Sequence, residues 1–246
     1  MSPSLFDQCS EPVQELFFLG EDVARTKDWP NYLDYGITST HIPELLRIIR
    51  QIQSFWDEDQ YTFDQGYTPI HAWRALGQLQ TTEAINTLIF LIHENEVYNS
   101  DWIGEEIPIV LMMIGPQSIP ALKAYLSSPE KEHWAAINAA HSLEKIGNEY
   151  PESRANCVAV LEHTLKDYIR NDETLNAFVI SYLADLKAVE SIPLVEQAFE
   201  SGNVDISVMG DYEDFQIAVG LLEKRLTPPL KYRWMKDPDR EWEAYR

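Results

Sequence analysis

The sequence has few cysteines, few glycines and no long hydrophobic run. Two cysteines, Cys9 and Cys157, are too few for a disulfide framework or a cysteine-rich zinc site. Ten glycines suit long helices better than a hairpin-rich β fold. The longest apolar run, 107–115, contains a proline and is too short to span a bilayer, and residues 1–20 lack the basic start of a signal peptide. We therefore expect a cytoplasmic protein that does not enter a membrane.

Basic residues are also scarce. The chain has 19 basic and 40 acidic residues, which gives a net charge of −21. Such a charge repels phosphate backbones and anionic membrane surfaces, so nucleic acid and lipid are disfavoured as partners. The acidity has two interpretations, which the sequence leaves open: it keeps the protein in solution, or it matches a basic partner or segment.

Apolar residues and aromatic rings, by contrast, are abundant. Apolar residues make up 45% of the chain, with nine Phe, twelve Tyr and seven Trp, which is enough to build a core. An internal repeat is also present: Leu-Gly-Gln-Leu at 76–79 returns 107 residues later as Leu-Ala-Asp-Leu at 183–186, and Glu83 and Ile85 return with it. This offset is close to three periods of about 36 residues, within the range of helix-pair repeats.

A second phrase marks where helices begin. Ile-Pro stands at 42–43, 119–120 and 192–193, and proline is tolerated in the first turn of a helix. Ser118 and Ser191 precede two of these pairs and are candidate N-caps. Apolar residues then follow at helical spacing. The pattern predicts about eleven helices, at roughly 12–26, 41–55, 69–79, 83–96, 102–114, 118–128, 131–147, 152–170, 173–186, 190–201 and 212–225.

These elements predict an all-α fold, an α-α superhelix (HEAT-like solenoid) of about five helix pairs over residues 1–226. Segments 27–40 and 56–68 carry aromatic residues and turn formers, and we expect ordered connections that cover one side of the stack. Residues 227–246 do not match the repeat and are rich in aromatic side chains. We expect them to form an irregular C-terminal cap packed on the last helices.

Five segments together resemble a bacterial HEAT-repeat family of unassigned function, whose members are often labelled by similarity to the HEAT-like repeats of phycobilisome lyases. The segments are 37–46, 71–77, 113–116, 143–147 and 210–214, and the likeness extends over nearly the whole chain. The resemblance implies the fold strongly and a reaction hardly at all, because repeats are scaffolds for many functions. Some members of the family end in a Cys-rich metal-binding tail; no cysteine follows Cys157 in this sequence, so that feature is not carried over.

The sequence has no catalytic signature. His93-Glu94 begins like a zinc-protease motif, but Val97 stands where the second histidine is needed. His133 and His141 are too far apart on one predicted helix to share a metal without a further ligand. Gly-rich phosphate loops and nucleophile motifs are absent. We therefore expect no catalytic residue, no metal site and no cofactor.

Two acidic clusters precede apolar helices. In one interpretation they are helix starts, with Asp101 and Asp211 as N-caps and the other acids favoured by the helix dipole. In the other, both lie at one edge of the solenoid and flank a groove for a basic ligand or an Arg/Lys-rich peptide. The clusters are Asp101, Trp102, Glu105 and Glu106, and Asp211, Tyr212, Glu213 and Asp214.

His71, Trp73 and Arg74 form a third candidate site with the same two-sided interpretation. Trp73 is either a core residue or a platform for a ligand, and we expect the core. Arg74 is notable because basic residues are few, and an ion pair with a neighbouring acid is its expected role.

Three hypotheses for function follow. The first is a non-enzymatic scaffold that binds a protein or peptide, for which a basic partner would match the charge, on its concave face or acidic edge. The second is an enzyme or enzyme subunit resembling HEAT-repeat phycobilin lyases, which would need an apolar cleft lined by aromatic and polar groups. The third, a HEAT-like DNA glycosylase, conflicts with the lack of a basic groove. We favour the first.

Overall fold

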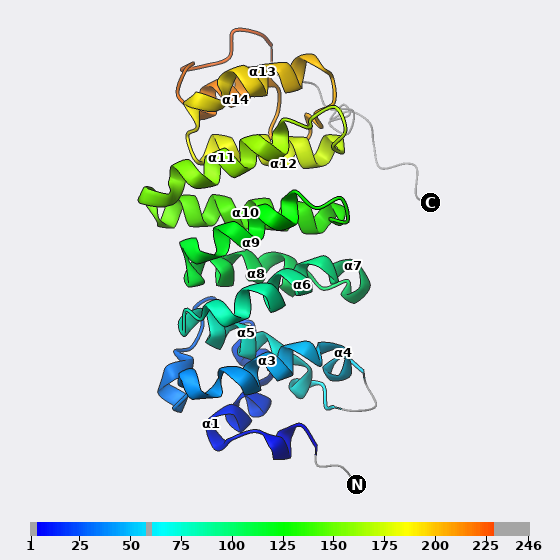
Figure 1. Ribbon diagram of the computed structural model, residues 1–246, viewed down its shortest axis with the longest axis vertical. Helices are drawn as coiled ribbons and strands as arrows, with labels where there is room; N and C mark the ends of the chain where they lie inside the picture. The colour runs from blue at the N-terminus through cyan, green and yellow to red at the C-terminus, as the bar shows by residue number, and fades with distance from the viewer. Residues whose placement is uncertain (1–3, 58–60, 229–246) are drawn as a thin grey trace, which may run out of the picture. The chain divides into compact units, whose positions relative to one another are not determined.

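The computed structural model describes residues 4–57 and 61–228, and all of its regular elements in these ranges are helices (Figure 1). The prediction of an all-α protein is therefore confirmed for the described part of the chain. The chain divides into two compact units, Met1–Leu161 and Glu162–Arg246, and the division falls within α11 (Arg154–Leu165).

The first unit is built from two rows of packed helices. Helices α5, α8 and α10 pack on one another in that order, and α3, α6 and α9 contact one another in the same way. Contacts of α3 with α5, of α6 with α8 and of α9 with α10 join the rows. The helices of this unit are α1 (Glu11–Gln14), α2 (Gly20–Ala24), α3 (Ile42–Arg50), α4 (Ile52–Phe55), α5 (Thr68–Gln78), α6 (Ile85–His93), α7 (Asn95–Tyr98), α8 (Asp101–Ile114), α9 (Ile119–Leu126) and α10 (His133–Glu149).

The second unit contains α12 (Glu173–Asp185), α13 (Ile192–Glu200) and α14 (Tyr212–Ala218). Helix α14 packs on both α12 and α13. Its Phe215 is fully buried, as are Leu183 of α12 and Val195 of α13. Burial of each such side chain stabilises the fold by about 1.5–3 kcal/mol relative to exposure.

The sequence repeat corresponds to a repeated local conformation. Two residues after the end of α5, Gln80 has a φ of 51°, and two residues after the end of α12, Lys187 has a φ of 53°, at the same 107-residue offset. In each copy the next residue donates its backbone N–H to the carbonyl five residues earlier. Thr81 donates to Leu76 at 3.5 Å, and Ala188 donates to Leu183 at 2.9 Å. This is the hydrogen bond of a Schellman helix end, so each unit contains the same helix–turn–helix step.

The predicted start of the second helix in each pair is observed, but its cap is not the predicted one. Three-residue 3-10 turns precede Ile42, Ile85, Ile119 and Ile192, where the α-helices begin. The hydroxyls of Ser118 and Ser191 do not cap these helices; they donate instead to the Leu111 carbonyl and to Glu162. Both serines occupy helical backbone, where the side chain cannot reach the free N–H groups ahead of it.

Three predicted helices are markedly shorter than expected, and one of them, predicted at 152–170, is α11, which ends at Leu165. The one predicted at 12–26 is α1, the 3-10 segment Glu15–Phe18 and α2, because Gly20 adopts a φ of +62°. A Cβ at Gly20 would lie 2.9 Å from the Asp64 carboxylate, so this close approach requires glycine. The helix predicted at 212–225 ends at Ala218, because Gly220 has a φ of +85° and turns the chain.

The long connections are ordered where they are described. Segment 27–40 contains the 3-10 turn Tyr32–Tyr35, and segment 56–68 contains the turn Asp64–Tyr67. Tyr32 is fully buried in the first unit. Residues 229–246, most of the predicted C-terminal cap, lie outside the described residues.

Within the described ranges, none of the helices is by itself long and apolar enough to cross a membrane. One pair bent by 110°, Asp101–Ile114 with Pro116–Leu126, reaches the required length and composition jointly.

Candidate functional site

Trp73 and Arg74 lie in the core of the first unit, where they share one carboxylate. Trp73 is fully buried and donates its indole N–H to Glu106 Oε2 at 2.8 Å. Arg74 is 1% exposed; its Nε donates to the same oxygen at 2.9 Å and its Nη2 forms an ion pair with Glu106 Oε1. The expected roles are confirmed: Trp73 is a core residue, and Arg74 pairs with an acid.

The Arg74 guanidinium makes further contacts that hold it in place. Its Nη2 donates to the Ala24 carbonyl at 2.7 Å, and its Cζ lies 4.7 Å from the centre of the Trp29 ring and 5.7 Å from the centre of the Trp102 ring. Burial opposes the charge on Arg74, but hydrogen bonding and attraction from Glu106 outweigh it and raise the pKa of the guanidinium. The pair connects α5, α8 and the chain around Ala24, so its role is structural.

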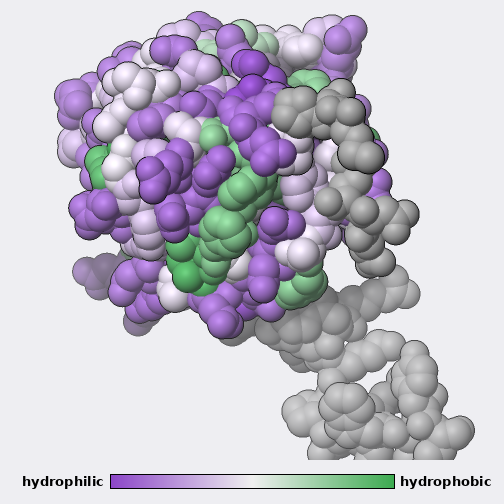
Figure 2. Space-filling model, turned by 90° about the horizontal axis from the view of Figure 1, so that it is seen from below, coloured by the Kyte–Doolittle hydropathy of each residue, from purple (hydrophilic) through white to green (hydrophobic). Residues whose placement is uncertain are grey.

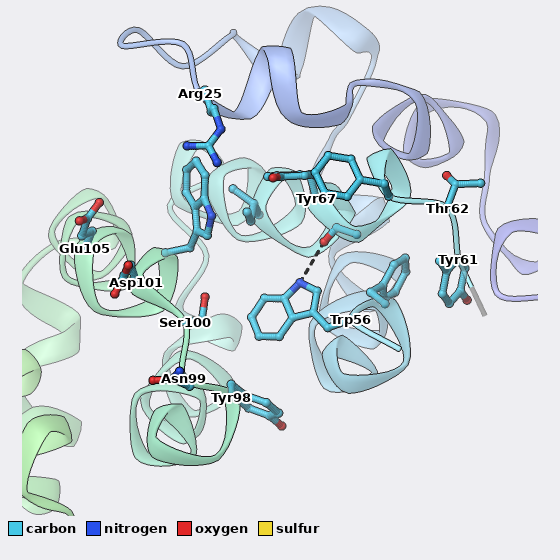
Figure 3. Close-up of a pocket in the computed structure, with 15 residues that line it drawn as sticks. Arg25, Trp56, Tyr61, Thr62, Tyr67, Tyr98, Asn99, Ser100, Asp101 and Glu105 are labelled. Atoms are coloured by element: carbon cyan, nitrogen blue, oxygen red, sulfur yellow. Dashed lines mark hydrogen bonds between the residues drawn. The ribbon is translucent and has the colours of Figure 1, made fainter. Parts of the chain in front are cut away.

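An open cleft of about 850 Å³ lies beside this network in the first unit (Figure 3). Its walls come from the chain around Arg25, the end of α4, the connection to α5, the end of α7 and the start of α8. Seven of its lining side chains are aromatic. The lining residues are Arg25, Phe55, Trp56, Tyr61, Thr62, Phe63, Gly66, Tyr67, Ile70, Tyr98, Asn99, Ser100, Asp101, Trp102 and Glu105.

The rings of the cleft are fixed by contacts with one another and with the backbone. Trp56 donates its indole N–H to the Gly66 carbonyl at 3.0 Å and meets Tyr98 edge to face, with ring centres 5.7 Å apart. Figure 3 shows Trp56 in the middle of the cleft, with Tyr98 below it. Tyr67 meets Trp102 edge to face at 6.0 Å. Edge-to-face pairs are favourable aromatic contacts, so these walls are formed in advance of any ligand.

The charges in the cleft are unevenly compensated. Arg25 is paired with Glu21 at 2.5 Å, and Tyr67 donates its hydroxyl to the same carboxylate at 2.9 Å. Asp101 and Glu105 are exposed, lie one turn apart on α8, and have no ion pair or hydrogen bond with any residue of the described ranges. The cleft therefore has a negative side, seen left of Trp56 in Figure 3.

Helix α8 thus divides the first predicted acidic cluster between the cleft and the core. Asp101, Trp102 and Glu105 line the cleft, whereas Glu106 points into the core and is 6% exposed. The prediction of Asp101 as an N-cap is wrong, because Ser100 holds that position and Asp101 is the first helical residue. Its carboxylate is therefore free to face the cleft.

Most of the cleft was missed by the sequence analysis. Trp56, Tyr61, Phe63 and Tyr67 belong to the aromatic connection 56–68, which we expected only to cover one side of the stack. A signal was present: these rings lie in a connection with turn formers rather than on the apolar stripe of a helix, where packing would explain them. Tyr98, at the end of α7, had no such signal.

The second acidic cluster, in the second unit, is a helix start. The Asp211 carboxylate accepts from the N–H groups of Glu213 at 3.0 Å and Asp214 at 3.3 Å, and Asp214 accepts from the Asp211 N–H at 3.0 Å. The predicted N-cap at Asp211 is confirmed as a reciprocal capping box. Tyr212 lies nearly parallel to Phe215, with ring centres 6.5 Å apart.

A cation from the same chain forms ion pairs with this second cluster. Arg225 forms ion pairs with Asp211 at 2.6 Å and with Asp214 at 2.5 Å. Hydrogen bonds from Arg225 are the main reason that the pKa of Asp211 is lowered. Glu213 accepts from the backbone N–H groups of Leu226 and Thr227 at 3.1 Å. The carboxylates that the sequence suggested for a ligand are thus bound within the second unit.

We expect Asp211→Ala to lower the free energy of unfolding of the second unit by about 1–2 kcal/mol, because the N-cap and its arginine partner are lost together. Chemical denaturation followed by circular dichroism measures this loss. Glu223→Ala is the matched control, because Glu223 is exposed and near Arg225 in sequence. An equal effect of both substitutions would show that the capping box contributes nothing.

No three His, Cys, Asp or Glu side chains of the described residues group in a way that could hold a metal ion. Cys157 is buried in α11, and burial raises the pKa of its thiol to about 11. Comparison of the chain with models of protein families, with curated proteins and with solved structures finds no match.

Proposed function

We propose that the protein is a non-enzymatic interaction module with HEAT-like helix pairs, and that it binds a basic segment of a protein partner in the aromatic cleft of the first unit. The observation that carries this proposal is the composition of the cleft: seven aromatic side chains around about 850 Å³, with Asp101 and Glu105, which have no partner among the described residues, on one side. Aromatic anchors provide binding energy in protein interfaces, and unpaired acids select a basic partner.

Two features support the repeat architecture in this proposal. The same helix end and the same 3-10 turn before the next helix recur 107 residues apart, at Gln80 and at Lys187. The first unit has two rows of helices packed in chain order. Modules of this kind are typical scaffolds for protein partners, and the resemblance to a HEAT-repeat family points in the same direction.

The surface offers additional support. Seen from below, the molecule shows a hydrophobic band bordered by hydrophilic residues (Figure 2). Exposed apolar side chains include Phe18 at 67% and Phe63 at 72%, and Phe63 lines the cleft. Contiguous apolar surface with a polar border is common at protein–protein contacts.

A second candidate function is an enzyme or enzyme subunit resembling phycobilin lyases, and the aromatic cleft is the observation that favours it. Its volume lies within the range of small-molecule sites. A bilin carries propionate carboxylates, however, which Asp101 and Glu105 would repel. Titration with a bilin, followed by visible absorbance, separates the two: a spectral shift lost in Trp56→Leu would favour the enzyme.

Selection from a random peptide library on the purified protein tests the interaction module. We expect the selected peptides to be rich in Lys and Arg and to bind less tightly at higher salt, since screening weakens exposed charge pairs. We expect Asp101→Asn/Glu105→Gln to lower the affinity for these peptides by about tenfold, which corresponds to the loss of two partly exposed ion pairs. Isothermal titration calorimetry measures the change.

The matched control is Glu130→Gln/Glu132→Gln, which removes the same charge from exposed residues that do not line the cleft. It should leave the affinity within about twofold, because exposed charges at a distance are screened. Equal weakening by both double variants would mean that net charge, and not the cleft, attracts the peptides. If the affinity of the selected peptides were unchanged in both double variants, the proposal would be contradicted.

A further inference from the structure

We infer that the group taken up by the cleft is a guanidinium, stacked on Trp56, and that Arg25 of the protein occupies a second such position over Trp102. This inference rests on the proposed function and names the chemistry that the cleft selects. It implies that the cleft is partly filled by its own chain, so that the partner's arginine competes with Arg25.

The protein itself contains contacts between cations and its indole rings. Three guanidinium–indole contacts occur in the described residues of the first unit: Arg74 over Trp29 at 4.7 Å, Arg74 over Trp102 at 5.7 Å, and Arg25 over Trp102 at 5.6 Å. The first two are part of the buried network. The third is at the cleft, where Arg25 and Trp102 both belong to the lining.

Trp56 is a comparable platform without a cation. It lines the same cleft, its indole N–H is bound to the Gly66 carbonyl, and Tyr98 meets it edge to face. None of the described Arg or Lys residues lies over its ring. Because its only polar atom is bound, the ring offers a fixed π face, and such a face attracts cations in a partly desolvated site.

The counter-charges favour guanidinium over ammonium. Asp101 and Glu105 lie one helical turn apart on the same side of α8, so two carboxylates border the cleft together. A guanidinium is planar and weakly hydrated; it can stack on an indole while its N–H groups bond to carboxylates at its edge. An ammonium has a tighter hydration shell and no flat face, so it gains less from an indole.

The position of Arg25 suits competition with the partner's arginine better than stabilisation of the fold. Its side chain is 62% exposed and is paired with Glu21, four residues earlier, to which Tyr67 also donates a hydrogen bond. An exposed pair of this kind contributes little to stability. Release of Arg25 from Trp102 would therefore cost little and would expose a second π face in the cleft.

The test uses a short, blocked peptide with one arginine flanked by glycines, and versions with lysine or with citrulline, the neutral isostere of arginine. Binding is followed by the indole N–H signals in NMR spectra of the isotope-labelled full chain. We expect the arginine peptide to bind about tenfold more tightly than the citrulline peptide, with the lysine peptide between them. Trp56→Leu should weaken the arginine peptide by about tenfold, whereas Trp134→Leu, at an exposed tryptophan outside the cleft, should not.

Variants of Arg25 test the competition. We expect Arg25→Ala to increase the affinity of the protein for the arginine peptide by about three- to tenfold. Arg170→Ala removes the same charge from an exposed residue of the second unit and should have no such effect. Glu21→Gln/Arg25→Ala keeps the net charge of the protein unchanged, and the gain should persist, because it comes from the freed Trp102 face and not from an unpaired Glu21.

The outcomes distinguish this inference from the proposed function. Equal binding of the arginine and citrulline peptides overturns the guanidinium assignment, and wild-type affinity in the Glu21→Gln/Arg25→Ala variant overturns the competition. Selected library peptides that lack arginine but still depend on Asp101 and Glu105 would overturn the inference and leave the interaction module standing. If neither the arginine peptide nor any selected peptide binds, both fail. Thermal unfolding of each variant verifies that it is folded.

Discussion

Replacement of Glu106 with glutamine is expected to lower the free energy of unfolding by about 3–5 kcal/mol. The substitution keeps an acceptor for the Trp73 indole but removes the charge that compensates Arg74, which is 1% exposed. An uncompensated buried cation is costly because the protein interior solvates it poorly. Among the described residues Arg74 Nη1 has no hydrogen-bond partner, so the remaining polar contacts there do not replace the lost one. Denaturant titration of the full chain measures the effect.

The neighbouring residue supplies the control. Glu105→Gln makes the same replacement of glutamate by glutamine one position earlier. This side chain is exposed and has no partner in the described ranges, so the free energy of unfolding should change by less than about 0.5 kcal/mol. Arg74→Met/Glu106→Gln removes both charges and should be more stable than Glu106→Gln alone, since no buried charge remains unpaired. Equal losses for Glu105→Gln and Glu106→Gln would disprove the structural role of the pair.

A second large effect is expected from acidification, through His71. This side chain is fully buried, and burial is the main reason that its pKa falls to about 4. The Gly20 carbonyl can only accept, so Nε2 carries the hydrogen, at 3.2 Å, and Nδ1 accepts from the Tyr32 hydroxyl at 2.8 Å. Burial also raises the pKa of Tyr32 to about 12, which keeps that hydroxyl protonated as a donor.

The direction of the pH effect follows from where the proton binds. Above pH 6.5 His71 is neutral in the folded and the unfolded chain, so it makes no pH-dependent contribution. Between pH 6.5 and about 4 only the unfolded chain binds the proton, and the free energy of unfolding falls as the pH falls. The full loss is about 3 kcal/mol, at roughly 1.4 kcal/mol per pH unit or less.

Stability measured from pH 7 to pH 4 in wild type and in His71→Gln isolates this contribution. The variant should show a flatter pH dependence, even if it is less stable at pH 7, because it cannot take up the proton. His163→Gln changes an exposed histidine and should keep the wild-type slope. His141, whose pKa is also lowered to about 4, mainly by burial, remains in both variants and cancels from the comparison. Parallel curves for wild type and His71→Gln would refute the effect.

The features that were predicted from the sequence are those that depend on neighbours in the chain. Apolar spacing placed the helices at 69–79, 102–114 and 173–186 within a few residues of α5, α8 and α12. Ile-Pro phrases marked helix starts because proline loses no hydrogen bond in a first turn. The N-cap at Asp211 was also local, because its carboxylate accepts from the N–H groups two and three residues later.

Errors arose where a distant residue determined the local structure. The helix predicted at 12–26 is broken at Gly20, whose carbonyl accepts from His71 Nε2 and where a Cβ would lie only 2.9 Å from the Asp64 carboxylate. Ser191 was expected to cap its helix, but its hydroxyl lies 2.8 Å from Glu162. Nothing in the neighbouring sequence specifies either contact, because these partners are separated by tens of residues.

By itself, the sequence determined that this protein is helical, that its helix–turn–helix step recurs at a 107-residue offset and that its charge is strongly acidic. Only the tertiary structure decided what the acidic residues do. Glu105 and Glu106 are adjacent and chemically identical, yet a helix turns successive side chains by about 100°, so one faces the cleft and the other meets Arg74 in the core. The cleft likewise exists only because α4, α7, α8 and residues 61–67 meet in space, and that meeting depends on packing between distant segments.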